Sequence, residues 1–250
     1  MRLAGRAAVV TGSSRGVGRG VALAYAKEGA DVLINYTSSE GPAQEIVEQI
    51  HSMGRKSVAI KADVAVKAEV EHMMESAKEN FGRLDILVNN AGFTRPSMLH
   101  KMSESDWDAV INAHLKGPFL CIQAAFKYFK EQKYGKVINV SSVAGLVGTV
   151  GQVNYSAAKG GILSFTKSVA REMSRHNVCA NVISLGIAET DMTEKIRSDE
   201  KLKDIYMNRI LLKRFAKTDD ISPAFVFLAA QDSDYITGQL LCVDGGYGMI

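Results

Sequence analysis

This chain of 250 residues has few cysteines, a small net charge and no long apolar run. Each of these features argues against a class of protein. The three cysteines show no CxxC spacing, so we expect buried free thiols in a reducing compartment rather than disulfides. The net charge is only +3 and no block of Lys and Arg occurs, so nucleic-acid binding is not indicated. The five histidines lack metal-ligand spacing, so no metal site is predicted.

No apolar run is long enough to span a membrane, and no signal peptide precedes the first strand-like segment. We therefore expect a cytoplasmic protein with no membrane partner. Apolar residues make up 46% of the chain, which is enough for a folded core. A length of 250 residues suits one α/β domain, so we expect residues 1–250 to form a single domain.

Short apolar segments of β-type composition alternate with longer helical patterns along the whole chain. The expected strands are Ala7–Thr11, Asp31–Tyr36, Ser57–Lys61, Ile86–Asn89, Lys136–Val140, Cys179–Ser184 and Leu240–Val243. Helices are expected near 16–28, 42–53, 67–81, 104–130, 154–175 and 219–230. This alternation predicts an α/β fold, a Rossmann-like, doubly wound parallel sheet of seven strands with helices on both faces. Ligands bind such sheets beyond the C-terminal ends of the strands.

A glycine-rich turn follows the first expected strand, with the spacing Gly-x-x-x-Gly-x-Gly. Glycines let the backbone turn tightly and let a pyrophosphate approach the helix N-terminus, where free N–H groups favour anions. Because this turn opens a series of strand–helix–strand units, it favours nucleotide binding over a purely structural turn. The expected cofactor contacts in the turn are Gly12, Ser14, Arg15, Gly16, Val17 and Gly18.

The segment after the second strand bears on which dinucleotide binds. NAD-selective sites usually carry Asp or Glu there, whereas this sequence reads Asn35, Tyr36, Thr37 with no acid before Glu40. Arg15 has a forked, permanently charged side chain suited to a 2′-phosphate, so we predict NADP(H); the alternative is a solvated Arg15. Further contacts are expected from residues after the third and fourth strands, namely Asp63, Val64, Asn90, Ala91 and Gly92.

Tyr155 and Lys159 lie four residues apart, which on a helix stacks their side chains on one face, about 6 Å apart along the axis. A phenol beside an ammonium is easier to deprotonate, and tyrosine needs such a shift to act as an acid or base near neutral pH. Ser142, the second residue of a Ser-Ser pair, precedes Tyr155 by thirteen positions. Each residue alone also has a structural interpretation, as a capping serine, a packed tyrosine or a surface lysine.

Together these motifs resemble the short-chain dehydrogenase/reductase family over essentially the whole chain. The matching residues are Thr11, Gly12, Gly16, Gly18, Asn89–Gly92, Ser142, Tyr155, Lys159 and Val243–Gly246. Within the family the sequence is most similar to the 3-oxoacyl-[acyl-carrier-protein] reductases, through Gly151–Lys159 and Glu189–Thr193.

The resemblance implies NADPH-dependent reduction of a 3-oxoacyl thioester to its 3-hydroxyacyl form. Tyr155 would protonate the carbonyl oxygen and Ser142 would hydrogen-bond that oxygen. Lys159 would bind the nicotinamide ribose and lower the pKa of Tyr155, and Thr190 would bond the carboxamide. The resemblance also implies a homotetramer and a small-molecule or carrier-linked acyl substrate, with acyl carrier protein as a partner.

Two positions depart from the family pattern. His114 stands where the family has an Asn that holds a water in the proton relay; Asn112, two residues away, faces another side of the helix. A neutral imidazole has one donor and one acceptor, so His114 is a relay candidate and could add a titration near neutral pH; the alternative is a packed histidine. Leu185 replaces the usual proline, which predicts a looser cofactor loop at Gly186 and Ile187.

Residues 191–215 are predicted to cover the substrate as a lid. Basic residues outnumber acidic ones there, which suits an acidic carrier protein or a phosphopantetheine arm, although a solvated surface is the simpler interpretation. One alternative is a 3-oxoacyl-CoA or 3-hydroxyacyl-CoA oxidoreductase, which His114-Leu115-x-Gly117 also resembles. Others are a sugar, polyol or small-ketone reductase and a non-enzymatic NADP-binding module, which the intact Ser142, Tyr155 and Lys159 argue against.

Overall fold

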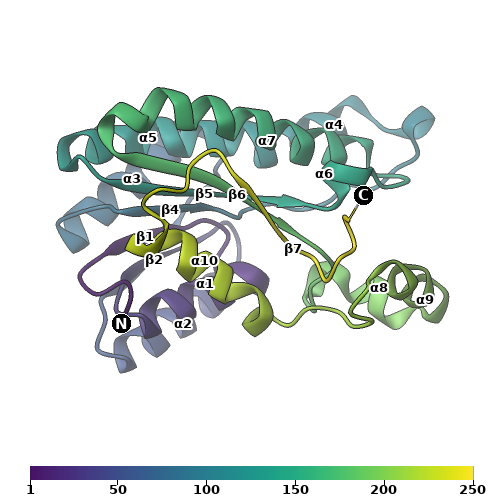
Figure 1. The fold of residues 1–250 in the computed structure, drawn as a ribbon, viewed down its shortest axis with the longest axis horizontal. Helices are drawn as coiled ribbons and strands as arrows, with labels where there is room; N and C mark the ends of the chain where they lie inside the picture. Colours follow the sequence, from purple (N-terminus) through teal and green to yellow (C-terminus); the bar gives the residue numbers. More distant parts are fainter. Residues whose placement is uncertain (250) are drawn as a thin grey trace.

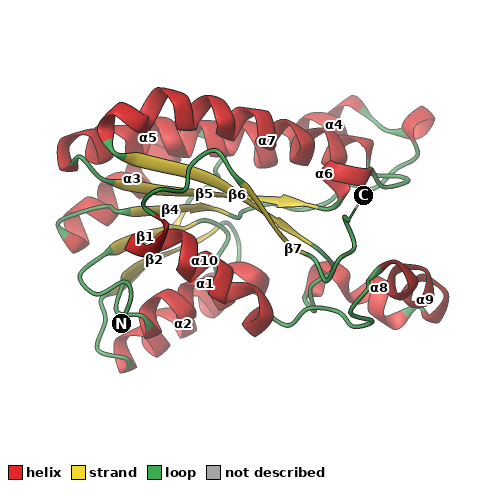
Figure 2. Cartoon of the chain, viewed as in Figure 1, coloured by secondary structure: helices red, strands yellow, loops and turns green. Residues whose placement is uncertain are grey.

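The computed structural model describes residues 1–249 as three layers, with one sheet between two layers of helices (Figure 1; Figure 2). All strands run parallel, in the order β3-β2-β1-β4-β5-β6-β7. They are β1 (Ala7–Val10), β2 (Asp31–Tyr36), β3 (Ser57–Lys61), β4 (Ile86–Asn89), β5 (Gly135–Ser142), β6 (Val178–Leu185) and β7 (Leu240–Val243). The predicted doubly wound, seven-stranded parallel sheet is therefore confirmed.

Helices cover both faces of the sheet, with α1, α2 and α10 on one face and α3, α5 and α7 on the other (Figure 1). The helices are α1 (Gly16–Lys27), α2 (Glu40–Ser52), α3 (Lys67–Phe81), α4 (Glu104–Ile111), α5 (Gly117–Gln132), α6 (Ala144–Val147), α7 (Val153–Met173), α8 (Glu194–Ser198), α9 (Glu200–Arg209) and α10 (Thr218–Ala229). Short 3-10 turns occupy Leu99–Lys101, Ser174–His176, Asp191–Thr193 and Gln231–Ser233.

The central strands are apolar throughout because each faces a helical layer on both sides. Successive residues of a strand point to opposite faces. In β1, Val10 packs into the core under α1, α2 and α10, whereas Val9 packs into the core under α3 and α5. In β4, Val88 packs into the same core as Val10, and Leu87 packs into the same core as Val9. The two cores hold the strand ends in fixed positions, and the candidate site lies beyond those ends.

The expected helix 104–130 is interrupted by a π turn. Helix α4 ends at Ile111, residues Asn112–Lys116 form the π turn, and α5 follows from Gly117. The start is as the sequence suggests, since the Ser103 side chain accepts a hydrogen bond from the Asp106 amide. A π turn inserts an extra residue into the helix and is often found at functional sites. Here it contains His114, which is buried.

The prediction of buried free thiols is confirmed for Cys121 and Cys179 and wrong for Cys242. Cys242 lies in β7, the edge strand beyond β6, where Leu240 and Leu241 are also exposed, by 39% and 37%. An apolar run normally indicates a buried strand, but an edge strand packs against a neighbour on only one side. The sequence does not say which strand is the outer one.

The predicted lid contains the 3-10 turn from Asp191, then α8 and α9. Neither α8 nor α9 fully buries any of its side chains, so this segment rests on the rest of the molecule through partial contacts. No helix within residues 1–249 is both long enough and apolar enough to cross a membrane. Among the same residues, no group of three His, Cys, Asp or Glu side chains is arranged to hold a metal ion.

Candidate active site

A cavity of about 630 Å³ opens beyond the C-terminal ends of the parallel strands. It brings together the predicted residues Gly12, Ser14, Arg15, Gly16, Val17, Asn35, Tyr36, Thr37, Asp63, Val64, Asn90, Ala91, Gly92, His114, Ser142, Tyr155, Lys159, Gly186 and Thr190. Two predicted contacts, Gly18 and Ile187, do not line it. Gly18 is instead packed beneath the turn, and the Ile187 carbonyl accepts a hydrogen bond from the Ala216 amide.

The glycine turn after β1 requires its glycines for two different reasons. Gly12 has φ +60, and a Cβ there would lie 2.7 Å from the Ala91 Cα, so no side chain fits. A Cβ on Gly18 would lie 2.5 Å from the Gly12 carbonyl oxygen, so Gly18 lets α1 begin close against the turn. The backbone amides at the start of α1 therefore face an open cradle, which suits the pyrophosphate of a dinucleotide.

Two side-chain amides, of which that of Asn35 is buried, hold this turn in place. The Asn35 side chain accepts from the Gly12 amide at 2.9 Å and donates to the Ala62 carbonyl at 2.9 Å. The Asn90 side chain donates to the carbonyls of Thr11 and Gly12 at 2.9 and 3.1 Å. Asn35 is only 1% exposed, so its amide positions the turn. Asn35 also lines the cavity, so its predicted contact with the cofactor stays a prediction beside this supporting role of its side chain.

Arg15 lies at the rim of the cavity with its side chain 70% exposed, and its guanidinium is 3.9 Å from the Asp191 carboxylate. Tyr36 and Thr37 line the same end of the cavity. Glu40, the first acid after β2, is hydrogen-bonded to Tyr36, which contributes to raising the Tyr36 pKa after the larger effect of desolvation. No carboxylate of β2 itself points at this end among the lining residues, so Arg15 is the charged group nearest to the expected 2′ position.

The proposed reacting hydroxyls come from β5 and α7. Ser142 ends β5, and Tyr155 lies in the first turn of α7. The Ser142 side chain accepts from the Ala144 amide at 3.2 Å, and its hydroxyl lowers the pKa of Tyr155. A carbonyl oxygen entering the cavity here could bond both hydroxyls at once. Both residues line the same cavity, and their roles in the reaction stay a prediction.

Lys159 lies one turn further along α7 but does not direct its charge at the Tyr155 hydroxyl. Its Nζ donates to the Val140 carbonyl at 2.6 Å and sits 5.6 Å from the centre of the Tyr155 ring. Burial lowers the Lys159 pKa to about 7. Burial also raises the Tyr155 pKa, and the bond from Ser142 lowers it only in part. The expected lowering of the Tyr155 pKa by Lys159 is thus not found in this structure.

His114 lies between Gly92, in the turn after β4, and Tyr155. A Cβ on Gly92 would be 1.9 Å from the His114 Cε1, and the imidazole meets the Tyr155 ring edge-on with 5.0 Å between centroids. Its Nε2 is 2.7 Å from the Phe93 carbonyl and 3.1 Å from the Phe93 amide, so it donates or accepts according to tautomer. Within residues 1–249 its buried Nδ1 has no hydrogen-bond partner.

The charge state of His114 differs from the sequence prediction. Burial, and then the nearby charge of Lys159, lower its pKa to about 3, while the bond to Phe93 raises it slightly. The imidazole is therefore neutral at working pH, and the expected titration near neutral pH is wrong for this environment. Sequence spacing alone carries no information about desolvation, which is the largest cause of this shift.

Leu185, which replaces the usual proline, is the last residue of β6 and pairs with Val243. Its carbonyl accepts from the Val143 amide at 3.0 Å, and the Gly186 amide donates to Val243 at 3.2 Å. The loop after β6 is therefore tied to both neighbouring strands at its base. Whether it is looser than in relatives stays a prediction.

Several lining residues were missed by the sequence analysis. They are Ser38, Ser39, Ala62, Phe93, Thr94, Ala113, Val140, Ser141 and Ala188, whereas the lining residues Leu185, Asp191, Met192 and Thr193 belong to the predicted cofactor loop and lid. Most directly follow a predicted strand or adjoin a predicted contact, so extending each motif by a few positions finds them. Phe93 carries no local signal, because large apolar residues in loops are common.

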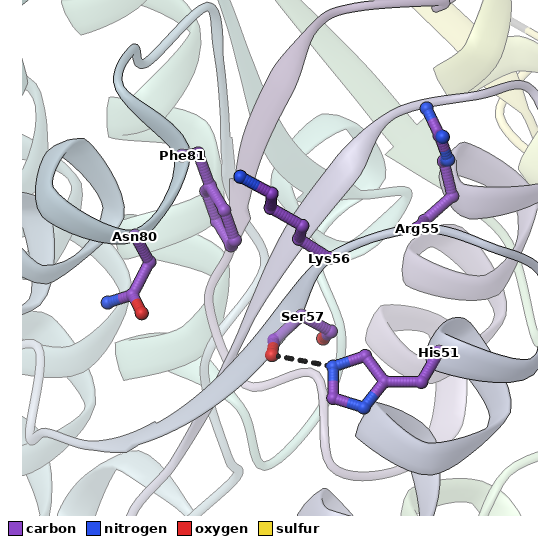
Figure 3. Close-up of a pocket in the computed structure, with 6 residues that line it drawn as sticks. All are labelled: His51, Arg55, Lys56, Ser57, Asn80 and Phe81. Atoms are coloured by element: carbon purple, nitrogen blue, oxygen red, sulfur yellow. Dashed lines mark hydrogen bonds between the residues drawn. The ribbon is translucent and has the colours of Figure 1, made fainter.

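A second hollow, of about 460 Å³, lies near the start of β3 and is lined by His51, Arg55, Lys56, Ser57, Asn80 and Phe81 (Figure 3). The His51 Nε2 donates to the Ser57 carbonyl at 3.1 Å, and the Lys56 side chain extends toward Phe81. This hollow lies near the N-terminal end of β3, whereas Tyr155 lies beyond the C-terminal ends of the parallel strands. The hollow and the candidate site are therefore at opposite ends of the strands. None of the predicted reacting residues lines it.

Known proteins resemble this chain over nearly its whole length. The profile of a family described as "Enoyl-(Acyl carrier protein) reductase" matches residues 12–248. The 3-oxoacyl-[acyl-carrier-protein] reductase FabG of Staphylococcus aureus (strain Mu50) is 45% identical over 244 residues, which cover 98% of each chain. A 3-oxoacyl-[acyl-carrier-protein] reductase of Synechocystis is 42% identical over 99% of this chain and 98% of its own.

Solved structures of dehydrogenases are also similar to this chain. A Sinorhizobium meliloti 1021 protein named provisionally as a short-chain alcohol dehydrogenase has TM-score 0.94 and 37% identity, over 98% of this chain and 97% of its own. A gluconate 5-dehydrogenase from Burkholderia cenocepacia, in complex with NADP and tartrate, has TM-score 0.95 and 32% identity, over 100% and 97%. This chain belongs to the short-chain dehydrogenase/reductase family. It is accordingly an NAD(P)-dependent oxidoreductase.

Proposed function

We propose that this protein uses NADPH to reduce the 3-oxo group of a carrier-linked acyl thioester, as in 3-oxoacyl-[acyl-carrier-protein], to the 3-hydroxyacyl form. The observation that carries the proposal is that Ser142, Tyr155 and Lys159 line the same cavity as the glycine turn, with Ser142 close enough to Tyr155 to lower its pKa. The relatives named 3-oxoacyl-[acyl-carrier-protein] reductase support the choice of substrate.

Each residue of the candidate site has its own role in the proposed reaction. When bound, NADPH supplies a hydride to the carbonyl carbon. Tyr155 donates its hydroxyl proton to the carbonyl oxygen, and Ser142 donates a hydrogen bond to the same oxygen, which stabilises its developing charge. Lys159 provides the positive charge that favours the phenolate left on Tyr155, and its Nζ is placed to bond a ribose hydroxyl at the same edge of α7.

NADP(H) rather than NAD(H) is proposed because of the residues at the rim after β2. Arg15 is exposed beside Tyr36 and Thr37, with Glu40 engaged by Tyr36. A guanidinium can bind a 2′-phosphate through two donors, whereas a carboxylate at this position would repel it. Replacing Arg15 by Ser should raise the KM for NADPH by about tenfold or more and leave that for NADH nearly unchanged.

His114 is proposed to occupy the relay position behind Tyr155 and Lys159. The buried Nδ1 without a partner is the atom available to bond a water there, and the neutral ring offers either a donor or an acceptor. His114→Asn should keep most activity, and His114→Ala should reduce kcat by about tenfold while NADPH still binds. Equal activity of wild type and His114→Ala would leave His114 a packed side chain only.

An acyl substrate is supported by large apolar side chains exposed on the segments that flank the cavity. Phe93 and Met192 line it, and they are 40% and 53% exposed. Val147 and Val150, between α6 and α7, are 43% and 86% exposed. Clusters of exposed apolar residues usually mark binding surfaces. The segment 191–215 is proposed as the lid over this apolar rim.

Charge on the lid gives weaker support for an acidic carrier than its composition suggested. Arg197 donates to the Thr190 carbonyl, Arg209 to the Tyr247 hydroxyl, and Arg214 forms two bonds to Asp220. These cations hold the lid in place. Only Lys195, Lys201 and Lys203 remain without an ion pair or hydrogen bond in residues 1–249, and they are the lid cations available to a carrier protein or phosphopantetheine arm.

Lys133 and Arg175 are the other candidate carrier contacts, and they lie at the ends of α5 and α7 remote from Tyr155. Helix α7 has 21 residues and therefore spans about 30 Å from the site to that end. The two residues belong to one patch, since the Asn177 side chain bonds the Lys133 carbonyl.

A homotetramer is proposed on the family resemblance, and the exposed apolar residues of two elements support it. Phe119 on α5 is 44% exposed, and the edge strand β7 exposes Leu240, Leu241 and Cys242. Light scattering coupled to size exclusion measures the assembly directly. A monomer at micromolar concentration would contradict this part of the proposal.

The alternatives differ in substrate rather than in site. A CoA ester uses the same reacting groups. A sugar-acid or polyol substrate is supported by the neighbour named gluconate 5-dehydrogenase, although the apolar rim fits an acyl chain better. An enoyl substrate is suggested by the description of the matching family profile, but it leaves the Ser142 and Tyr155 hydroxyls without a carbonyl at the reacting carbon.

The deciding experiment follows NADPH absorbance with matched substrates. We expect the highest kcat/KM with acetoacetyl linked to acyl carrier protein, lower values with acetoacetyl-CoA, and little turnover of 5-ketogluconate or crotonyl-CoA. Tyr155→Phe, which keeps the ring and loses the proton, is the matched control. Turnover of 5-ketogluconate or crotonyl-CoA above that of both 3-oxoacyl thioesters would overturn the proposal.

A further inference from the structure

The last described residues of the chain form a tight turn that ends near the active site. The Asp244 carboxylate accepts hydrogen bonds from the amides of Gly246 and Gly248, both at 2.9 Å. This folds residues 244–248, called here the C-terminal turn, back on themselves after β7. Figure 1 shows the chain after β7 passing from the side of α8 and α9 toward α6.

One side of the C-terminal turn is attached to the end of α9. The Arg209 Nη1 donates to the Tyr247 hydroxyl at 3.2 Å, and the rings of Tyr206 and Tyr247 stack with 6.4 Å between centroids and 24° between planes. The Leu212 amide donates to the Gly245 carbonyl at 3.2 Å. Three separate contacts thus join the lid to the turn, and two of them use the Tyr247 side chain.

The other side of the C-terminal turn touches the site itself. A Cβ on Gly186, in the cofactor loop after β6, would lie 2.8 Å from the Asp244 Cα. A Cβ on Gly248 would lie 3.4 Å from the Leu146 side chain and 3.5 Å from that of Val143, the residue after Ser142. The turn therefore packs against the cofactor loop and the segment that follows the catalytic serine.

The lid is also held by the buried Ile210 and Phe215 and by the bonds of Arg197 and Arg214, but α8 and α9 themselves have few other contacts. No side chain of α8 or α9 is fully buried. Segments with little buried apolar surface open at low cost in free energy. Ile205, Leu211 and Leu212 remain 43%, 58% and 66% exposed, which leaves an apolar lid surface next to the turn.

We propose that Tyr247 is a positioning residue that seats α9 on the C-terminal turn and thereby sets how the lid holds a long acyl chain; this rests on the proposed function. Its hydroxyl is fixed by Arg209 and its ring by Tyr206. A long chain leaving the carbonyl carbon must pass the lid, whereas a four-carbon acyl group is held mainly at Ser142 and Tyr155. Tyr247 thus favours long 3-oxoacyl thioesters over short ones.

The test compares KM and kcat for 3-oxooctanoyl and acetoacetyl thioesters of one carrier. Tyr247→Ala should raise the KM for the eight-carbon substrate by about tenfold, with kcat and the four-carbon KM within about twofold. Tyr247→Phe keeps the stacking and loses only the bond to Arg209, so a rise of about threefold is expected. Arg209→Ala should match Tyr247→Phe, and the double variant should add nothing further. Tyr235→Ala, at a fully exposed tyrosine before β7, is the control.

Hydrogen exchange supplies a readout that does not depend on activity. The amides of residues 202–209 should exchange faster in Tyr247→Ala than in wild type, while those of β5 and α7 stay unchanged. Unchanged exchange together with an unchanged eight-carbon KM would overturn the inference, as would equal rises in KM for both chain lengths. If wild type reduces no 3-oxoacyl thioester, the proposed function fails, and the exchange result still decides whether Tyr247 seats the lid.

Discussion

Replacing Lys159 by methionine separates its role in catalysis from its effect on stability. Lys159 is 3% exposed, and burial lowers its pKa from 10.5 to about 7. The only hydrogen bond of its side chain within residues 1–249 is the one from Nζ to the Val140 carbonyl. Methionine has a similar length and no charge, so the variant removes a buried ionisable group with little change in packing.

The direction of the pH effect follows from the two pKa values. The unfolded chain holds this proton up to about pH 10.5 and the folded chain only to about pH 7, so the unfolded state binds more protons in between. The stability of the wild type therefore rises with pH across this range. Below pH 7 the full penalty applies, roughly 5 kcal/mol for a gap of about 3.5 between the pKa values.

Part of that gain is offset in the variant, because losing the bond to the Val140 carbonyl costs about 1–3 kcal/mol. We expect Lys159→Met to be about 2–4 kcal/mol more stable than wild type at pH 6. At pH 10, where the folded wild type is neutral at this position, the variant should be no more stable than wild type. Its ketone reduction should be almost absent at either pH.

Urea unfolding of the dinucleotide-free protein at pH 6, 8 and 10, at one fixed protein concentration, measures this difference. Lys167→Met, an exposed lysine on the same helix, is the control and should change stability little at any pH. A difference in stability between wild type and Lys159→Met that is the same at pH 6 and pH 10 would refute the reasoning.

Three further substitutions test other parts of the site. Tyr155→Phe should lower ketone reduction by at least about a hundredfold while NADPH fluorescence titration shows unchanged binding; preserved turnover would exclude Tyr155 as the proton donor. Gly92→Ala places a methyl group 1.9 Å from the His114 ring, so thermal unfolding should show a loss of roughly 1–3 kcal/mol, which Gly92→Ala/His114→Ala should partly recover. Asn35→Ala leaves the Gly12 amide and the Ala62 carbonyl without their partner, so stability should fall by about 2–4 kcal/mol and the dinucleotide Kd should rise; no change in Kd would show that the turn holds its shape unaided.

The sheet could be predicted from the sequence because its signals are local and repeated. Each inner strand is a short run of apolar residues, and only a parallel sheet covered on both faces buries such runs completely. Ile86–Asn89 was predicted with its observed bounds, and the strand predicted at Lys136–Val140 proved longer at both ends. Strand ends are less certain because hydrogen bonding to a neighbour, rather than composition, decides where pairing stops.

The π turn could not be predicted because it is a tertiary effect. Gly117 and Pro118 interrupt the helical pattern of residues 104–130 and coincide with the start of α5, but nothing local marks Asn112 as the start of a wider turn. The His114 ring must fit against Gly92 and the Tyr155 ring, and the inserted residue helps to direct it there. The exposure of Cys242 is a similar case, since it depends on the position of β7 in the sheet.

Motif spacing predicted which residues meet in the site but not their charges or hydrogen bonds. Tyr155 and Lys159 do lie on one side of α7, yet the Lys159 Nζ bonds the Val140 carbonyl. Desolvation, which no spacing reveals, is the largest cause of each shift: it raises the Tyr155 pKa and lowers those of Lys159 and His114. The sequence identifies the reacting groups, and only the surroundings determine their protonation.

These shifts lead us to expect that the candidate reacting groups become active only when the cavity is filled. With a Lys159 pKa of about 7, much of this lysine is uncharged near neutral pH, and a Tyr155 pKa above its usual value keeps the phenol protonated. The negative phosphates of a dinucleotide at the glycine turn favour the protonated lysine, which in turn favours loss of the tyrosine proton. We therefore expect cofactor binding to promote activation of Tyr155 through the charge on Lys159, since a lysine with a pKa of about 7 readily gains and loses its proton near neutral pH.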